Sequence, residues 1–169
     1  MKPPLYIFLL LVVLCSSFIN NKKEQPISIH FKTTENQVDR DSIIAYAKKY
    51  LGTPYVYAGN DPKKGFDCSG FVSYVFKNYG VTLPRSSGEY KNIGIKLNPE
   101  EFKIGDILVF YGYKDKSIIG HLGIICEANG MKSKFIHASS GKAQCVTITS
   151  LDTEHYTNRF YKCIDVLTK

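Results

Sequence analysis

The sequence predicts a single α+β domain, in which N-terminal helices pack on a central antiparallel β-sheet. Two segments with helical spacing of apolar residues come first, and five strand-like runs separated by turns follow. A length of 169 residues suits one domain with a proper core. The 12 Tyr and 10 Phe also favour a good deal of strand.

The chain begins with the features of an export signal. A lysine precedes an apolar run over residues 5–19, which is shorter than the ~20 residues that a membrane-spanning helix needs. We interpret residues 1–19 as a signal peptide or a lipoprotein signal. Cys15 in "VVLC" is either a cysteine that becomes lipidated or an apolar member of the signal core. Residues 20–38 are polar and have no period, which predicts a tether to a folded domain over residues 39–169.

The first helix is predicted from apolar residues at helical spacing over residues 43–51. Asp39 or Asp41 can cap its start, and Gly52 is its expected stop. The Pro and Gly residues of the following segment, residues 53–66, predict an extended loop.

The second helix is predicted from a similar repeat of apolar residues over residues 71–79. Its start falls within residues 67–70, and Gly80 ends it. A further loop over residues 81–94 leads to the part of the chain that carries the strands.

Strand-like runs and turns alternate in the rest of the chain. Asn129-Gly130 is a strong turn signal, so the second and third runs are predicted to form a hairpin. The five runs are "DILVFYG", "HLGIICEA", "KFIHAS", "CVTIT" and "RFYKCIDVL".

The formal charge of +7 favours acidic partners. Lys and Arg are scattered in ones and twos, however, and no stacking motif or Cys/His finger spacing accompanies them. This pattern indicates weak attraction to an anionic surface and excludes a nucleic-acid footprint. The cysteines and histidines also lack close ligand spacing, so no metal and no cofactor are expected.

Three of the cysteines lie inside strand-like apolar runs. Cys126, Cys145 and Cys163 are therefore expected to be buried apolar filler. A bridge between Cys145 and Cys163 remains an alternative in an exported chain.

Cys68 differs from the other cysteines because it stands at the predicted start of the second helix. There, unsatisfied backbone N–H groups and the positive end of the helix dipole favour a thiolate. A thiolate hydrolase also needs a histidine as base and proton donor. His30 lies in the tether and His155 in a polar turn, so neither is expected in a rigid site.

His121 and His137 are the better candidates for the base. His121 opens one strand of the predicted hairpin and His137 ends the other, which places the imidazoles near the same end of neighbouring strands. One can then fix which ring nitrogen of the other faces the thiol. Each histidine taken alone is more often a buried structural residue of a strand. The joint occurrence of two such histidines and a cysteine at a helix start is less easily explained by packing.

Six motifs occur in the order and spacing of one known family. They are "GTPYVYAG", "DCSGFV", "LPRSS", "IGDILVF", "GHLGII" and "FIHAS", and together they cover nearly all of residues 39–166. The chain resembles the NlpC/P60 family of bacterial cell-wall cysteine peptidases. The resemblance implies a papain-like fold with a circularly permuted order of elements. It also implies hydrolysis of peptidoglycan stem peptides, typically between D-glutamate and a diamino acid.

The resemblance assigns roles to the central residues of these motifs. Cys68 matches the nucleophile, His121 the general base and His137 the polar residue that orients it. Tyr55 matches a tyrosine beside the nucleophile, whose hydroxyl could help to hold the oxyanion, although a loop aromatic that packs on the core explains it as well. Tyr57 occupies the place of a pocket wall, where the family often carries Trp.

Further residues of the motifs match a substrate groove. Asp67 and Ser69 match positions that help to bind the free amino group of the stem peptide, although Asp67 also reads as a plain helix cap. Arg85 and Ser86 resemble a segment that lines the groove, where the guanidinium could pair with a substrate carboxylate, or Arg85 is a solvated surface residue.

The predicted function is therefore that of an exported endopeptidase of the cell envelope, monomeric, with peptidoglycan stem peptides as its partners. Its only expected link to a membrane is an N-terminal lipid or an uncleaved signal. Two alternatives stay open: another thiol amidase or acyltransferase, and a non-catalytic domain that binds wall peptides. The spacing from His121 to His137 is also a few residues longer than is usual in the family, and the extra residues lie at the predicted hairpin tip.

Overall fold

The computed structural model describes residues 39–168. The predicted signal over residues 1–19, with Cys15, and the tether over residues 20–38 lie outside this part of the chain. The helices are α1 Arg40–Lys48, α2 Cys68–Lys77 and α3 Glu154–Thr157, with short 3-10 helices η1 Ser87–Asn92 and η2 Pro99–Glu101. The strands are β1 Asn60–Asp61, β2 Gly65–Phe66, β3 Ile95–Leu97, β4 Ile107–Tyr111, β5 Ile119–Glu127, β6 Lys134–Ala138, β7 Val146–Ser150 and β8 Phe160–Asp165.

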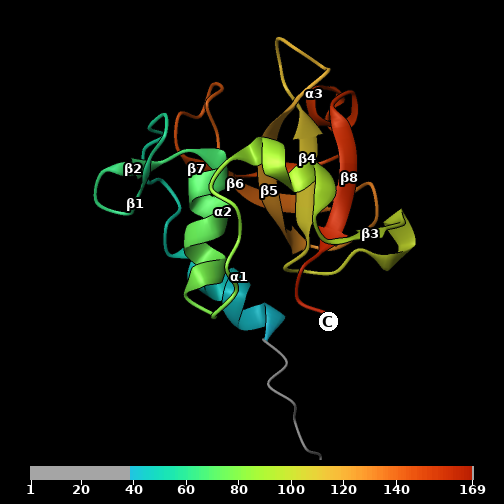
Figure 1. The fold of residues 1–169 in the computed structure, drawn as a ribbon, viewed down its shortest axis with the longest axis horizontal. Coiled ribbons are helices and arrows are strands. Elements are labelled where there is room, and N and C mark those ends of the chain that lie inside the picture. Colours follow the sequence, from blue (N-terminus) through green and yellow to red (C-terminus); the bar gives the residue numbers. More distant parts are fainter. Residues whose placement is uncertain (1–38, 169) are drawn as a thin grey trace, which may run out of the picture. The chain divides into compact units, whose positions relative to one another are not determined.

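Six of the strands form one antiparallel sheet in the order β3-β8-β4-β5-β6-β7 (Figure 1). Helices α1 and α2 pack on one face of it through the larger of two apolar clusters, and α3 packs through the smaller cluster on the other face. The predicted α+β fold is confirmed. No helix within the described residues is long and apolar enough to cross a lipid bilayer.

Helix α1 begins where the sequence predicted. The carboxylate of Asp39 accepts hydrogen bonds from the backbone N–H groups of Asp41 and Ser42 at 3.1 and 3.2 Å. The helix ends at Lys48, and Gly52 follows with φ +83°. Arg40 ties the helix to the sheet by ion pairs to Asp106 and Asp165 at 2.6 and 2.9 Å.

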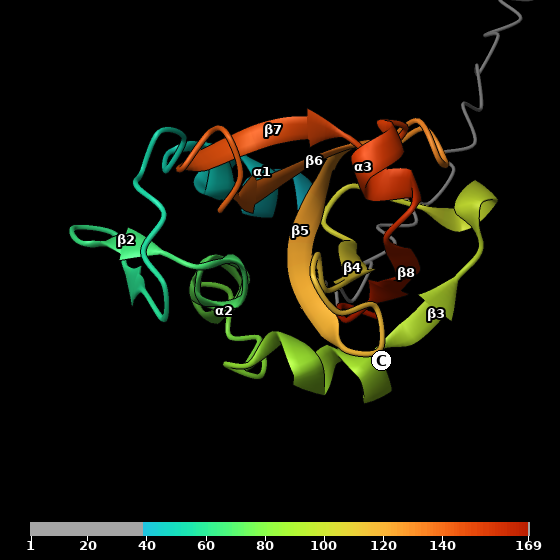
Figure 2. The same ribbon diagram turned by 90° about the horizontal axis from the view of Figure 1, so that it is seen from above.

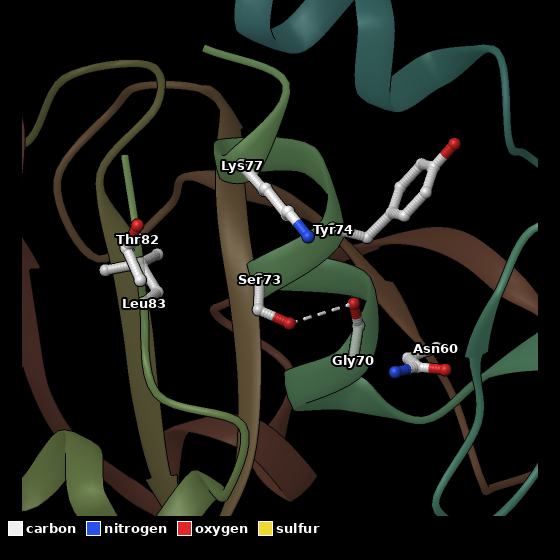
Figure 3. A pocket seen from close by; sticks show the side chains of 7 residues that line it. All are labelled: Asn60, Gly70, Ser73, Tyr74, Lys77, Thr82 and Leu83. Atoms are coloured by element: carbon white, nitrogen blue, oxygen red, sulfur yellow. Dashed lines mark hydrogen bonds between the residues drawn. The ribbon is translucent and has the colours of Figure 1, made fainter. Parts of the chain in front are cut away.

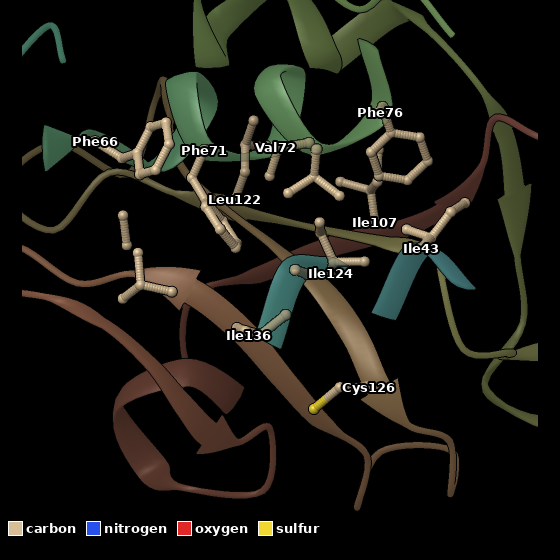
Figure 4. Close-up of a cluster of buried hydrophobic side chains, with 14 of the residues drawn as sticks. Ile43, Phe66, Phe71, Val72, Phe76, Ile107, Leu122, Ile124, Cys126 and Ile136 are labelled. Carbon is tan, nitrogen blue, oxygen red and sulfur yellow. The ribbon is translucent and has the colours of Figure 1, made fainter. Parts of the chain in front are cut away.

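Helix α2 begins at Cys68 because Asp67 caps it, accepting the backbone N–H of Gly70 at 2.6 Å. Its apolar face is fully buried against the sheet, and Gly80, with φ +76°, follows its end. Figure 4 shows this face meeting the side chains of β4, β5 and β6; the labelled residues include Phe71, Val72, Phe76, Ile107, Leu122, Ile124 and Ile136.

Four short elements, β1, β2, η1 and β3, lie where the sequence predicted no regular structure. The loop over residues 53–66 contains the two-residue pairing of β1 with β2, and residues 81–94 contain η1. Strand β3 covers the edge of β8. Each element is too short to show a period of its own, and tertiary contacts define it. In η1, for example, Tyr90 is fully buried and its hydroxyl donates to the carbonyl of Pro84.

The hairpin between the second and third predicted runs is confirmed. Strands β5 and β6 pair in antiparallel register, with Ile124 opposite Ile136, and the turn lies at Asn129-Gly130. A register shift between Ile125 and Glu127 takes up an extra residue near the tip. The strand ends that carry His121 and His137 lie away from this irregularity.

The four cysteines in the described residues are all free. The alternative of a Cys145–Cys163 bridge is therefore wrong for this structure. Cys126 and Cys163 are buried as expected, but Cys145 is only half-buried because it precedes β7 and does not lie inside it.

Candidate active site

Cys68 lies at the first position of α2, where the helix start meets β5. Its side chain is 7% exposed. Its thiol lies near three backbone N–H groups, those of Leu122, Ser69 and Cys68 itself, which favour the thiolate. Leu122 directly follows His121, so this contact brings the thiol to the strand that carries the candidate base.

The resting charge of Cys68 is set chiefly by burial. Burial, followed by the neighbouring carboxylate of Asp67, raises the pKa of the thiol to about 11, and the three N–H groups only partly offset this. The backbone N–H groups at the helix start thus favour the thiolate, as the sequence predicted. Desolvation of a charged sulfur outweighs the helix terminus, so the resting form is a thiol.

The two histidines of the hairpin form a direct hydrogen bond. His121 Nε2 lies 2.9 Å from His137 Nδ1, and the rings stand nearly perpendicular at 89°. The expected proximity of the imidazoles is confirmed. Because Nε2 of His121 is engaged, its Nδ1 is left to exchange a proton with another group.

Both imidazoles are buried, which keeps them neutral. Burial is the main cause that holds the pKa of His121 well below its usual range, and the positive charges of neighbouring groups add to it. The pKa of His137 falls to about 3, again chiefly through burial. A neutral His121 is able to accept a proton at neutral pH.

A second hydrogen bond continues the chain beyond His137. His137 Nε2 lies 2.9 Å from the hydroxyl oxygen of Thr149 on β7, and the Tyr156 hydroxyl lies 3.5 Å from the same nitrogen. With Nδ1 of His121 unprotonated, Nε2–H of His121 donates to His137, and Nε2–H of His137 donates to Thr149.

Sequence reasoning missed Thr149 and Tyr156. The signal for Thr149 was the alternation of "CVTIT", which places Thr147 and Thr149 on one face of the strand next to His137. Tyr156 carried no such signal, because α3 is only one turn long.

His155 was excluded by its polar turn, yet the structure brings it close to the histidine pair. The turn is helix α3, where Nε2 of His155 lies 2.7 Å from Nη1 of Arg159. Burial is the largest cause of the low pKa of His121; the charges of His137, Arg159 and His155 follow in that order. His155 is exposed and packs against Tyr156, so its exclusion from the rigid site stays a prediction.

Tyr55 pairs with Phe66, two residues before Cys68. Its pKa is raised by burial first and then by the negative charges of Cys68 and Asp67, and the Ser140 side chain opposes this shift. The backbone N–H of Tyr55 donates to the carbonyl of Gln144 at 2.9 Å, which holds the loop in place. Tyr57, by contrast, is 87% exposed and stands free of the core.

The predicted groove residues Asp67, Ser69 and Arg85 contact one another. The guanidinium of Arg85 donates to both carboxylate oxygens of Asp67, at 2.9 and 2.8 Å, and to the Ser69 hydroxyl at 3.1 Å. Ser86 begins η1, and its backbone N–H donates to Glu89 at 3.3 Å. Arg85 is thus ion-paired with Asp67, while its side chain is 42% exposed.

A pocket of about 310 Å³ lies along another face of α2 (Figure 3). Ser73, Tyr74 and Lys77 contribute to its lining, and none of the predicted site residues does. Within residues 39–168, no group of three His, Cys, Asp or Glu side chains is placed to hold a metal ion.

Comparison with known proteins matches this fold and this arrangement to one family. The chain is 38% identical over 118 residues to a γ-DL-glutamyl hydrolase from Bacillus subtilis, an alignment that covers 69% of this chain and 27% of that protein. It is 32% identical over 120 residues to a γ-D-glutamyl-L-lysine dipeptidyl-peptidase from Bacillus cereus, covering 71% of this chain and 34% of that protein. The chain thus spans between a quarter and about a third of the length of these relatives.

A solved structure of an NlpC/P60 family protein from Bacillus cereus superposes with a TM-score of 0.68. It is 29% identical, and the match covers 77% of this chain and 41% of that one. The model of the NlpC/P60 family itself matches residues 52–165, which include every predicted site residue of the described part. The chain therefore belongs to the NlpC/P60 family.

Proposed function

We propose that this protein is a cysteine endopeptidase that hydrolyses peptidoglycan stem peptides. The observation that carries the proposal is the hydrogen bond between His121 Nε2 and His137 Nδ1. His121 belongs to β5, the strand whose Leu122 N–H lies near the Cys68 thiol. Together, these groups are a nucleophile, a base and a residue that orients the base.

The proposed reaction starts from a neutral thiol and a neutral imidazole. His121 Nδ1 takes the proton of Cys68 as the sulfur attacks the carbonyl carbon of the scissile peptide bond. His121 then gives this proton to the leaving amine, the C–N bond breaks, and an acyl thioester remains on Cys68. A water molecule loses a proton to His121 and attacks the thioester, and the sulfur leaves and recovers the proton.

His137 acts on this cycle through His121. Its Nδ1 accepts the Nε2–H of His121, which fixes the tautomer with an unprotonated Nδ1 and steadies the imidazolium that forms during the attack. The oxyanion is assigned to the backbone N–H of Cys68 and the Tyr55 hydroxyl, since Tyr55 pairs with Phe66 just before the nucleophile and the charge of Cys68 raises its pKa.

The proposed scissile bond joins D-glutamate to a diamino acid. The names of the two relatives, a γ-DL-glutamyl hydrolase and a γ-D-glutamyl-L-lysine dipeptidyl-peptidase, support this choice. Asp67 and Ser69 are assigned to the free amino group of the stem peptide. Because Arg85 already neutralises Asp67, we assign it the role of holding this carboxylate in place. Ser86 and the exposed ring of Tyr57 are assigned to the groove wall.

The test is cleavage of the tetrapeptide L-Ala-γ-D-Glu-L-Lys-D-Ala by the purified protein, followed by mass spectrometry. The expected products are L-Ala-γ-D-Glu and L-Lys-D-Ala. Cys68→Ala and His121→Ala should abolish cleavage, whereas Cys126→Ala, the same change at a buried cysteine away from the site, should retain it. An intact tetrapeptide with the wild-type protein, or undiminished cleavage by Cys68→Ala, would end the proposal.

The same experiment separates the two alternatives. A non-catalytic wall-peptide domain would bind the tetrapeptide and leave it intact. A thiol amidase or acyltransferase with another substrate would leave it intact and still lose its activity on that substrate in Cys68→Ala. We place the enzyme in the cell envelope as an exported protein, by the apolar N-terminal run, and Cys15 is the candidate for lipid attachment.

A further inference from the structure

Arg159 is a buried cation that the proposed reaction does not use. It lies directly before β8 and is only 8% exposed. Its Nε donates to the carbonyl of Tyr111 at 3.0 Å, and its Nη1 lies 2.7 Å from Nε2 of His155. The guanidinium also lies over the ring of Tyr113, at 5.9 Å from the centroid. The side chain is thus anchored on three sides.

No carboxylate within residues 39–168 forms an ion pair with Arg159. This sets it apart from Arg40, which pairs with Asp106 and Asp165, and from Arg85, which pairs with Asp67. A buried guanidinium is costly without an anion, and its planar fork is suited to a carboxylate.

One edge of the guanidinium is available. Neither of the recorded hydrogen bonds of Arg159 uses Nη2. Every fully buried side-chain nitrogen of the described residues has a partner. Nη2 is therefore not completely buried. Around it, Tyr113 is 72% exposed and His155 is also exposed.

Arg159 stands on the His121 side of the candidate site. Its backbone carbonyl accepts from the N–H of Tyr111, next to Phe110, and Phe110 pairs with His121 across the sheet. Helix α3 and β8 lie on one side of β5 in Figure 2, and β2 and α2 lie on the other. Arg159 directly precedes β8 and Asp67 stands between β2 and α2, so the two charged groups belong to segments on opposite sides of β5.

We propose that Arg159, anchored by Tyr111 and His155 and bordered by Tyr113, forms a subsite for the carboxylate of the residue that follows the scissile bond. This inference rests on the proposed function. The acyl part of the substrate is assigned to the Asp67 side, so the leaving part extends past His121, which hands its proton to the leaving amine. In a tripeptide ending in the diamino acid, the leaving residue carries a free α-carboxylate, which the unpaired Nη2 can bind.

The test compares the tripeptide L-Ala-γ-D-Glu-L-Lys with its C-terminal amide. The wild-type protein should cleave the acid with a kcat/KM about ten-fold higher, which corresponds to one hydrogen bond between charged groups. In Arg159→Gln, the ratio between acid and amide should fall to about one through loss of activity on the acid. Lys162→Gln removes a partly buried cation of the same strand, one that donates to backbone carbonyls, and should keep the wild-type ratio.

A retained ratio in a folded Arg159→Gln overturns the inference, and so does a wild-type ratio near one. If thermal melts show that Arg159→Gln does not fold, the ratio of kcat/KM between acid and amide in the wild-type protein decides whether the subsite exists. If the wild-type protein cleaves neither peptide, the proposed function fails, and calorimetric binding of both peptides to Cys68→Ala decides about the subsite. Tighter binding of the acid that Arg159→Gln abolishes supports the subsite, and equal binding of acid and amide overturns it.

Discussion

At the scale of single residues, burial sets the protonation of the candidate nucleophile and base. The pKa of Cys68 is raised to about 11 and that of His121 is lowered, chiefly by burial in both cases. A thiolate–imidazolium pair requires the opposite order of the two pKa values. The resting pair is therefore neutral, and the proton moves when the substrate arrives.

This order predicts the pH dependence of alkylation at Cys68. With a pKa near 11, the thiolate fraction rises about ten-fold for each pH unit between pH 6 and 10, so the rate should rise in proportion. The measurement is the iodoacetamide rate constant at Cys68, with Cys126→Ala as background control. Rapid alkylation at pH 5 that does not change with pH would indicate a preformed ion pair instead.

Thr149 is predicted to position His137. Thr149→Val removes the hydroxyl that accepts from His137 Nε2, and kcat/KM should fall about ten-fold, the value of one buried hydrogen bond of ~1.5 kcal/mol. The tautomer of His137, read from its ¹⁵N chemical shifts, should lose its uniformity. Thr147→Val makes the same change two residues away in β7, at the residue that pairs with His137 through the backbone but whose hydroxyl forms no hydrogen bond to the imidazole, and should alter neither readout.

At the scale of elements, the close approach of β5 and β6 holds the histidine pair together. Gly123 makes this approach possible, because a Cβ atom there would lie 2.3 Å from the ring of Phe135 and 3.3 Å from Cβ of His137. Phe135 is fully buried in the smaller apolar cluster, so its ring has little room to move.

Gly123→Ala should therefore separate the two strands. The expected cost is about 1–3 kcal/mol in the free energy of unfolding, together with a loss of peptide cleavage, because His137 is pushed from its hydrogen bond. Urea unfolding and kcat/KM measure the two effects. Gly88→Ala adds the same methyl group where the nearest atom is 3.8 Å away, and should change neither quantity. An unchanged free energy of unfolding in Gly123→Ala would contradict this prediction, because it would show that the ring of Phe135 can move aside.

At the scale of the whole molecule, the buried histidines couple stability to pH. The folded pKa of His137 is about 3, below its ordinary value of 6.5, and that of His121 is lowered too. The unfolded chain therefore binds these protons more readily. The contribution of the histidines to stability is complete above pH 6.5 and is lost as the pH falls toward their folded pKa values.

Each histidine should then cost about 1.4 kcal/mol of unfolding free energy per pH unit below pH 6.5. Urea unfolding at pH 7, 6 and 5 covers a range above the ordinary pKa values of the carboxylates. The double variant His121→Gln/His137→Gln should flatten the dependence in this range. Equal slopes for the wild-type protein and the double variant would mean that other groups carry it.

The sequence by itself determined the elements that have a period or a cap, and the identity of the reactive side chains. Asp67 and Gly80 delimit α2, and the Asn129-Gly130 turn predicts the hairpin that pairs His121 with His137. These features are local: a cap, a glycine at positive φ and an alternation of apolar residues act over a few residues of chain.

Only the tertiary structure decided the environment of those side chains. Burial outweighed the effect of the helix start on the pKa of Cys68, and the Arg85–Asp67 pair joined two residues assigned to separate contacts. The segment from α3 to β8 brought His155 and Arg159 close enough for their charges to lower the pKa of His121. Desolvation and charge pairing depend on segments that lie far apart in the sequence, so no local pattern carries them. The identities of single residues thus determine which reactive groups the candidate site contains, and the packing around them determines their charge state.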